Sequence, residues 1–200
     1  MAFAEGKYDV FERAVAFASE KHSGQTRRLS DAPYILHPLE VATIVGTMTD
    51  DAELLAAAVL HDTVEDAGVT LEEIDELFGR RVQLLVMTET EDKRAERPAA
   101  ETWELRKEET LLVLQNTRDI AVKMLWLGDK LSNMRSFYRE YLRQGNALWQ
   151  QFNQKDPKRQ AWYYRTIAQY VSVLSEHEAY REYVRLMNTV FETVDGGNAQ

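Results

Sequence analysis

Apolar residues recur at helical spacing along nearly the whole chain of 200 residues. Within residues 7–22, for example, Phe11, Ala14 and Ala18 fall on one face of a helix. No stretch has the pattern of a strand-rich domain, so the spacing predicts an all-α fold. The length suits one domain with a sizeable core. With neither an internal repeat nor a separating linker, we expect a single domain over residues 1–200.

Caps and helix breakers mark where the helices begin and end. Asp50 or Asp51 is expected to cap the helix that leads to His61, because a carboxylate accepts the unpaired N–H groups of a first turn. Pro38 suits the first turn of a second helix, and Thr70 with Glu73 forms a capping box for a helix that stops at Gly79. A helix over 80–88 and a charged mobile loop over 89–100 are expected next. Helices over 101–115 and 119–143 follow, and Asp156-Pro157 opens a C-terminal helical region.

Charge and composition exclude several classes of protein. The net charge of −9 disfavours a dedicated nucleic-acid binder, whose affinity would come from a basic surface. The chain has no cysteine, which excludes disulfides and thiolate metal sites and fits a reducing compartment. The longest apolar stretch, residues 54–60, is too short to cross a bilayer. We therefore expect a cytoplasmic protein with neither a nucleic acid nor a membrane as partner.

Four ionisable residues cluster at the end of an apolar, alanine-rich run. Residues 56–60 lead into His61-Asp62, and Glu65-Asp66 follow. An unpaired buried charge is costly, and a metal ion can satisfy several carboxylates together. On a helix, Asp62, Glu65 and Asp66 share a face. Because imidazole and carboxylate together suit Mn²⁺, Fe²⁺ or Zn²⁺, this pattern predicts a catalytic metal site at the helix end.

A second polar set lies inside the apolar helix expected over 119–143. Asp129 and Asn133 are four residues apart and should face one way. Gly128 removes a side chain next to the carboxylate, which allows an ion or another helix to approach closely. Asp129 is therefore the candidate that completes the metal ligands. The predicted set is His37, His61, Asp62 and Asp129.

Four motifs occur in a fixed order between about residues 7 and 140. They are His22-Ser-Gly-Gln25-Thr-Arg27-Arg28, Pro33-Tyr-Ile-Leu-His37-Pro38, Leu60-His61-Asp62-Thr-Val-Glu65-Asp66 and Gly128-Asp129-Lys130-Leu131-Ser132-Asn133-Met134-Arg135. In these motifs the chain resembles the hydrolase domain of the RelA/SpoT family and, by size, the stand-alone small alarmone hydrolases of the HD superfamily. The C-terminal extension, about 146–194, does not contribute to the resemblance.

The resemblance implies an HD-domain helical bundle that binds one divalent metal, usually Mn²⁺. The implied reaction removes pyrophosphate from the 3′ position of ppGpp or pppGpp and leaves GDP or GTP. The implied roles are metal binding for His37, His61, Asp62 and Asp129, water activation for Glu65 and Asp66, and nucleotide binding for Arg27, Arg28, Asn133 and Arg135. These roles suit the side chains, because adjacent carboxylates can orient a water and accept its proton, and arginine matches phosphate geometry.

The chain departs from the family pattern where the substrate should bind. Trp126 stands where the family usually has lysine, Ser132 where it has histidine, and Gly128 where it has alanine. Two alternatives therefore remain open: hydrolysis of another nucleotide, such as NADPH or a nucleoside phosphate, and a sensor that binds a nucleotide without turnover. Intact Glu65 and Asp66 favour the enzyme. A homo-oligomer is left open as a partner.

Overall fold

The protein is all-α, as the apolar spacing predicts. The computed structural model describes residues 6–195, with side chains up to residue 192. Within that range the only β-type pairing is an isolated bridge between Thr26 and Pro33. Packing divides the chain into two compact units, one reaching to Thr90 and the other starting at Glu91. The expected single domain over 1–200 stays a prediction.

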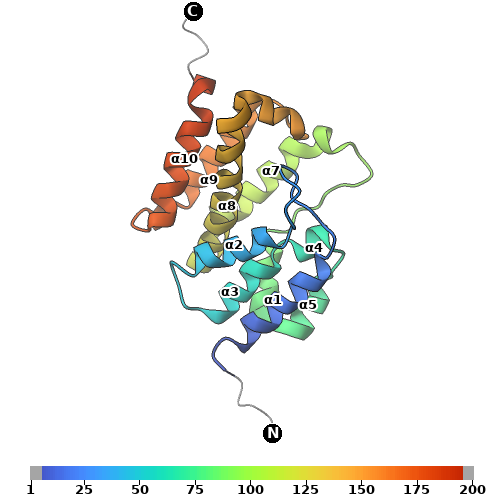
Figure 1. Ribbon diagram of the computed structural model, residues 1–200. Coiled ribbons are helices and arrows are strands. Elements are labelled where there is room, and N and C mark those ends of the chain that lie inside the picture. Colours follow the sequence, from blue (N-terminus) through green and yellow to red (C-terminus); the bar gives the residue numbers. More distant parts are fainter. Residues whose placement is uncertain (1–5, 196–200) are drawn as a thin grey trace, which may run out of the picture. The chain divides into compact units, whose positions relative to one another are not determined.

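The first unit is built around one almost fully buried helix (Figure 1). Its helices are α1 (Asp9–Lys21), α2 (Leu36–Val45), α3 (Ala52–Leu60), α4 (Thr63–Asp66), α5 (Leu71–Phe78) and α6 (Arg80–Met87). Helices α1, α2 and α6 pack against α3, whose residues 56–60 are all inaccessible to solvent. Three successive alanines on α3 let these neighbours approach closely, so the helix before His61 is buried as expected.

The second unit packs its longest described helix beside its last one. It contains α7 (Ala99–Asn116), α8 (Ile120–Gln144), the 3₁₀ helices η1 (Gly145–Gln151) and η2 (Ser172–Leu174), α9 (Pro157–Tyr170) and α10 (Glu178–Asp195). Helix α8 lies against α10, which also contacts α9 (Figure 1). Stacking of Trp149 on Phe191, with ring centroids 5.3 Å apart, ties η1 to α10. This aromatic packing makes the C-terminal extension an integral part of the second unit.

The predicted caps form. Asp51, rather than Asp50, caps α3 by accepting the N–H groups of Glu53 and Leu54 at 3.1 and 3.3 Å. The side chain of Thr70 accepts the N–H of Glu73, which is the Thr70 half of the predicted capping box, while the Glu73 carboxylate contacts Lys21 at 3.2 Å. Gly145 ends α8 at φ 58°, a left-handed conformation that glycine adopts without strain. Asp156 caps α9 and Pro157 occupies its first turn. These contacts lie within a few residues, which is why sequence alone could predict them.

We expect replacements of Asp51 to separate its two roles. The carboxylate caps α3 and also pairs with Arg81, and the bonded guanidinium lowers the pKa of Asp51. Asp51→Asn keeps a good cap and should cost about 0.5 kcal/mol of unfolding free energy. Asp51→Ala loses both contacts and should cost about 1.5 kcal/mol. Urea unfolding measures both, and equal losses would contradict the capping role.

The Asp51 ion pair should also depend on pH with a defined sign. A carboxyl whose pKa is lowered on folding stabilises the protein above its unfolded pKa, and the effect is lost as pH falls through the folded pKa. The difference in stability between wild type and Asp51→Asn should therefore be present at neutral pH. It should shrink as the pH falls below the ordinary aspartate value of 3.8. Urea midpoints at several pH values measure this difference, and a gap that widens in acid would contradict the ion pair.

Candidate functional site

His61 and Asp62 lie in the turn between two helices. Helix α3 ends at Leu60, His61 is its C-terminal cap, and Asp62 is the N-terminal cap of α4. The N–H of Asp66 donates to the carbonyl of Asp62 at 2.8 Å, which keeps the expected helical relation between these two residues. The two residues proposed to bind metal thus form the junction between α3 and α4, and both have helical backbone angles.

One hydrogen bond orients the imidazole of His61. Its Nδ1 lies 2.9 Å from the carbonyl oxygen of Ala58, one turn earlier in α3. Because a carbonyl only accepts, Nδ1 carries the proton of the neutral ring and Nε2 keeps its lone pair. Nε2 faces the Oδ2 atom of Asp62 at 3.1 Å. A backbone carbonyl on the far ring nitrogen is the usual arrangement for a metal-binding histidine.

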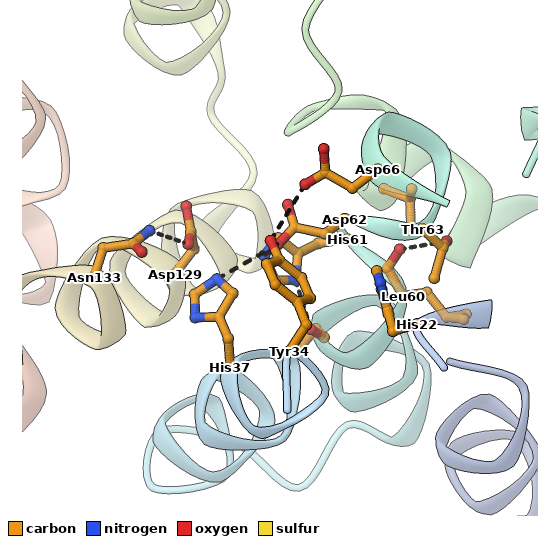
Figure 2. Close-up of polar contacts among 12 residues, drawn as sticks. His22, Tyr34, His37, Leu60, His61, Asp62, Thr63, Asp66, Asp129 and Asn133 are labelled. Atoms are coloured by element: carbon orange, nitrogen blue, oxygen red, sulfur yellow. Dashed lines mark hydrogen bonds and ion pairs between the residues drawn. The ribbon is translucent and has the colours of Figure 1, made fainter. Parts of the chain in front are cut away.

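His37 approaches the same carboxylate oxygen from α2. Its Nε2 lies 3.5 Å from Asp62 Oδ2, and its ring centroid is 5.2 Å from that of His61 (Figure 2). Pro38 follows in the first turn of α2, as predicted, so His37 lies in that first turn as well. Two ring nitrogens from different helices thus converge on one aspartate oxygen in the first unit.

The spacing of these three atoms fits a divalent metal. Ligands about 2.1 Å from a common ion lie roughly 3.0–3.4 Å from one another in octahedral or tetrahedral geometry. The 3.1 Å separation of His61 Nε2 from Asp62 Oδ2 lies within that range, and the 3.5 Å separation of His37 Nε2 lies just above it. The side chains of His37 and His61 are 2% and 1% exposed, whereas that of Asp62 is 18% exposed. The ligand set is thus buried on the histidine side and accessible on the carboxylate side.

The predicted water-activating carboxylates lie on the solvent side of α4. Glu65 is half-buried and Asp66 is exposed. Asp66 Oδ2 lies 3.2 Å from the hydroxyl of Tyr34, which also donates to Asp62 Oδ2 at 2.7 Å. Burial and then the charge of Asp62 raise the pKa of Tyr34. Sequence alone predicts no role for Tyr34, and its position three residues before His37 in the second motif is the one signal that points to it.

The arginines of the first motif lie on a loop that the isolated bridge closes. The N–H of Arg27 donates to the carbonyl of Ala32 at 3.0 Å, and the N–H of Tyr34 to that of Gln25 at 2.9 Å. The Arg27 guanidinium carbon lies 5.7 Å from the centroid of the Tyr34 ring. Arg28 is exposed. Arg27 is therefore connected to the carboxylates through Tyr34, while the nucleotide-binding role of both arginines stays a prediction.

Asp129 and Asn133 face one way on α8, as their spacing predicts. The Asn133 amide donates to Asp129 Oδ1 at 2.6 Å, and Lys130 pairs with the other carboxylate oxygen. The Lys130 ammonium lies 4.7 Å from the Trp126 ring centroid. Trp126 is fully buried, so the residue that replaces the family's usual lysine supports Lys130 from within the second unit. Metal binding by Asp129 stays a prediction.

Arg135 already has an acidic partner within the second unit. Its Nε and Nη2 atoms each lie 2.7 Å from an oxygen of Glu182 on α10. This two-point contact lowers the pKa of Glu182, because the carboxylate accepts both hydrogen bonds. Sequence reasoning did not foresee the pairing, since the two residues are far apart in the chain. A role of Arg135 in nucleotide binding stays a prediction beside this structural contact.

The chain belongs to the HD domain family, whose model matches residues 14–157. It is 39% identical over 130 residues to the guanosine-3′,5′-bis(diphosphate) 3′-pyrophosphohydrolase of Aquifex aeolicus, covering 65% of this chain and 18% of that protein. It is 40% identical over 135 residues to a probable GTP pyrophosphokinase of Mycobacterium leprae, covering 67% of this chain and 16% of that protein. The chain thus spans less than a fifth of the length of these curated relatives.

Two solved structures share the fold. A protein of Listeria monocytogenes EGD-e superposes with a TM-score of 0.68 at 30% identity, over 78% of this chain and 99% of that one. A metazoan ortholog of SpoT, described as hydrolysing ppGpp, superposes with a TM-score of 0.69 over 95% of this chain and 98% of that one. Its 24% identity supports the fold alone. The all-α HD architecture expected from the motifs is confirmed.

Proposed function

We propose that this protein is a metal-dependent phosphohydrolase that removes the 3′-pyrophosphate of ppGpp or pppGpp. The observation that carries the proposal is the convergence of His37 and His61 on Asp62, with the Glu65-Asp66 pair on the next helical turn. The family match covers all five residues. The Aquifex aeolicus relative is named for this reaction.

The proposed metal ligands are His37, His61, Asp62 and Asp129, and the proposed metal is Mn²⁺. Two imidazoles with carboxylates form a donor set that a borderline divalent ion accepts. Asn133 supports the choice of Asp129, because a carboxylate ligand is commonly oriented by a neighbouring hydrogen-bond donor. A divalent metal would neutralise phosphate oxygens and lower the pKa of a water molecule.

The other side chains proposed for this site activate the water or bind the nucleotide. Glu65 and Asp66 would orient the attacking water and accept its proton. The water oxygen would bond to the phosphorus next to the 3′ oxygen while the bond between these two atoms breaks. Pyrophosphate would then leave, and the 3′ oxygen would take up a proton to become a hydroxyl. We assign phosphate or base contacts to Arg27 and Arg28, since guanidinium groups bind phosphate through paired hydrogen bonds and stack on bases. Asn133 and Arg135 are proposed to hold the guanosine part, and the contact with Glu182 holds the Arg135 guanidinium in place.

A substrate panel tests this function. With Mn²⁺, purified protein should convert ppGpp to GDP and pyrophosphate, and pppGpp to GTP and pyrophosphate. Phosphate-free guanosine and a chelator-treated sample serve as controls. Turnover of NADPH or a nucleoside phosphate, with none of ppGpp, would reject the alarmone substrate and keep the phosphohydrolase. Tight nucleotide binding without any turnover would instead identify a sensor.

Two residues on α8 are the reason to test other nucleotides and a sensor without turnover. Trp126 and Ser132 are fully buried and replace the lysine and histidine usual at these positions. Substitutions near a substrate site can change which nucleotide is accepted without removing the chemistry. Another nucleotide is therefore the second candidate, while the intact acidic pair on α4 argues against a sensor without turnover.

Location and assembly stay predictions. Among the described residues, no helix combines the length and the apolarity needed to cross a membrane. We propose a cytoplasmic location, where guanosine nucleotides are available, and leave a homo-oligomer open. We also propose that the protein takes no nucleic acid as partner, since its net charge is −9.

A further inference from the structure

Tyr34 connects three parts of the first unit that the proposed reaction needs. Its hydroxyl lies 2.7 Å from Asp62 Oδ2 and 3.2 Å from Asp66 Oδ2, between a proposed metal ligand and a proposed water-activating group (Figure 2). The guanidinium of Arg27 lies over its ring. Tyr34 thus contacts one proposed metal ligand, one proposed water-activating carboxylate and one proposed nucleotide-binding arginine.

The surrounding contacts hold Tyr34 in place. Its ring packs between His22 and His37, with centroid distances of 5.0 and 6.0 Å. The backbone N–H of Tyr34 donates to the carbonyl of Gln25. Gln25 also contacts His22 Nδ1 at 2.8 Å and donates to the backbone carbonyl of Asp66 at 2.9 Å. A ring held on two sides, with its backbone tied to the same loop, has little freedom to move its hydroxyl.

The position of this hydroxyl has chemical consequences. A phenol is protonated at neutral pH and has one hydrogen to donate. Donation to Asp62 Oδ2 orients the carboxylate whose same oxygen faces both histidine Nε2 atoms. The longer 3.2 Å contact shares the same hydrogen with Asp66 Oδ2 and holds that otherwise exposed carboxylate beside the Tyr34 hydroxyl. Because two nearby carboxylates repel each other, a shared donor between them also favours their close approach.

We propose that Tyr34 is a positioning residue for the hydrolytic reaction, an inference that rests on the metal site of the proposed function. Its hydroxyl aligns Asp62 for the metal and Asp66 for the attacking water. Its ring holds Arg27, the arginine assigned to the nucleotide, through a cation–π contact. Tyr34 transfers no proton and forms no bond to substrate; it acts through these three neighbours.

Two substitutions separate the hydroxyl from the ring. Tyr34→Phe removes the hydroxyl and keeps the ring, whereas Tyr34→Leu removes both. Tyr180→Phe is the matched control, because the Tyr180 hydroxyl donates to the backbone carbonyl of Ala168 at 3.2 Å and contacts no proposed site residue. Titration of Mn²⁺, followed by the electron paramagnetic resonance signal of the free ion, gives metal affinity without any substrate. Steady-state kinetics with ppGpp then gives kcat and KM, and circular dichroism confirms folding.

Tyr34→Phe should weaken Mn²⁺ binding about 10-fold and lower kcat by roughly 10- to 100-fold, the usual effect of losing a hydrogen bond to a metal ligand. Its KM should stay near that of wild type, because Arg27 keeps its aromatic contact. Tyr34→Leu should in addition raise KM about threefold, as a surface cation–π contact predicts. Tyr180→Phe should leave all three values unchanged.

The outcomes test the role of Tyr34 separately from the identity of the substrate. Wild-type Mn²⁺ affinity and kcat in Tyr34→Phe would overturn it, as would equal losses in Tyr180→Phe. If wild type binds Mn²⁺ but does not hydrolyse ppGpp, the substrate assignment fails while the Mn²⁺ titration still decides the role of Tyr34. If wild type binds no Mn²⁺, both proposals fail.

A double substitution gives a second measure of the link to Asp66. If Tyr34 acts partly through Asp66, adding Tyr34→Phe to Asp66→Asn should lower kcat less than it does in wild type, because coupled residues are not additive. Fully independent losses, together with unchanged Mn²⁺ affinity, would overturn the positioning role.

Discussion

Asp62→Ala is expected to abolish Mn²⁺ binding and to lower the rate of ppGpp hydrolysis by on the order of 10³-fold. Its Oδ2 atom is the common neighbour of both histidine Nε2 atoms, so its removal takes away the centre of the ligand set. A metal contributes several kcal/mol to stabilising the charge of a phosphoryl transition state, and about 1.4 kcal/mol corresponds to a factor of ten in rate. Metal analysis of the purified variant, followed by kinetics, measures both effects.

The control for Asp62→Ala is a surface aspartate in the same unit. The side chain of Asp75 on α5 pairs with the solvent-exposed Arg80 at 3.2 Å, and the described residues give it no other ion pair. Asp75→Ala should therefore keep full metal content and rate, since exposed ion pairs contribute little. Asp129→Ala should behave like Asp62→Ala. Full metal retention in both Asp62→Ala and Asp129→Ala would show that the ligand set is wrong.

Glu65→Gln is expected to keep the metal and to lower kcat by roughly 10²- to 10⁴-fold, the usual contribution of a general base. The amide has the shape of the carboxylate but accepts no proton at neutral pH. Glu65 lies on α4, one turn after Asp62, and is half-buried, so part of its side chain is accessible to water. The retained metal separates loss of water activation from loss of the site.

A glutamate outside the site provides the comparison for Glu65→Gln. Glu76 on α5 is exposed, and Glu76→Gln should change neither kcat nor metal content. If Glu65→Gln turns over ppGpp at the wild-type rate, Glu65 has no part in the mechanism, and Asp66 becomes the remaining candidate base. Asp66→Asn, measured in parallel, shows which carboxylate accepts the proton.

Local patterns predicted the helices well because helix formation is decided over short stretches of chain. The first helix, expected over 7–22, extends from Asp9 to Lys21, and the one expected over 119–143 is α8. The charged loop expected over 89–100 ends slightly earlier, because α7 begins at Ala99, directly after Pro98. Proline fits immediately before a helix, since its missing N–H has no intrahelical partner there.

By itself, the sequence determined the all-α fold, the caps and the residue types available for catalysis. Spacing along one helix was also enough to place Asn133 beside Asp129. Only the tertiary structure decided which atoms meet across helices: His37 from α2 with His61 from the end of α3, Tyr34 between Asp62 and Asp66, and Arg135 with Glu182. The physical reason is that helical periodicity specifies a face within one segment, whereas contacts between segments depend on how buried side chains pack.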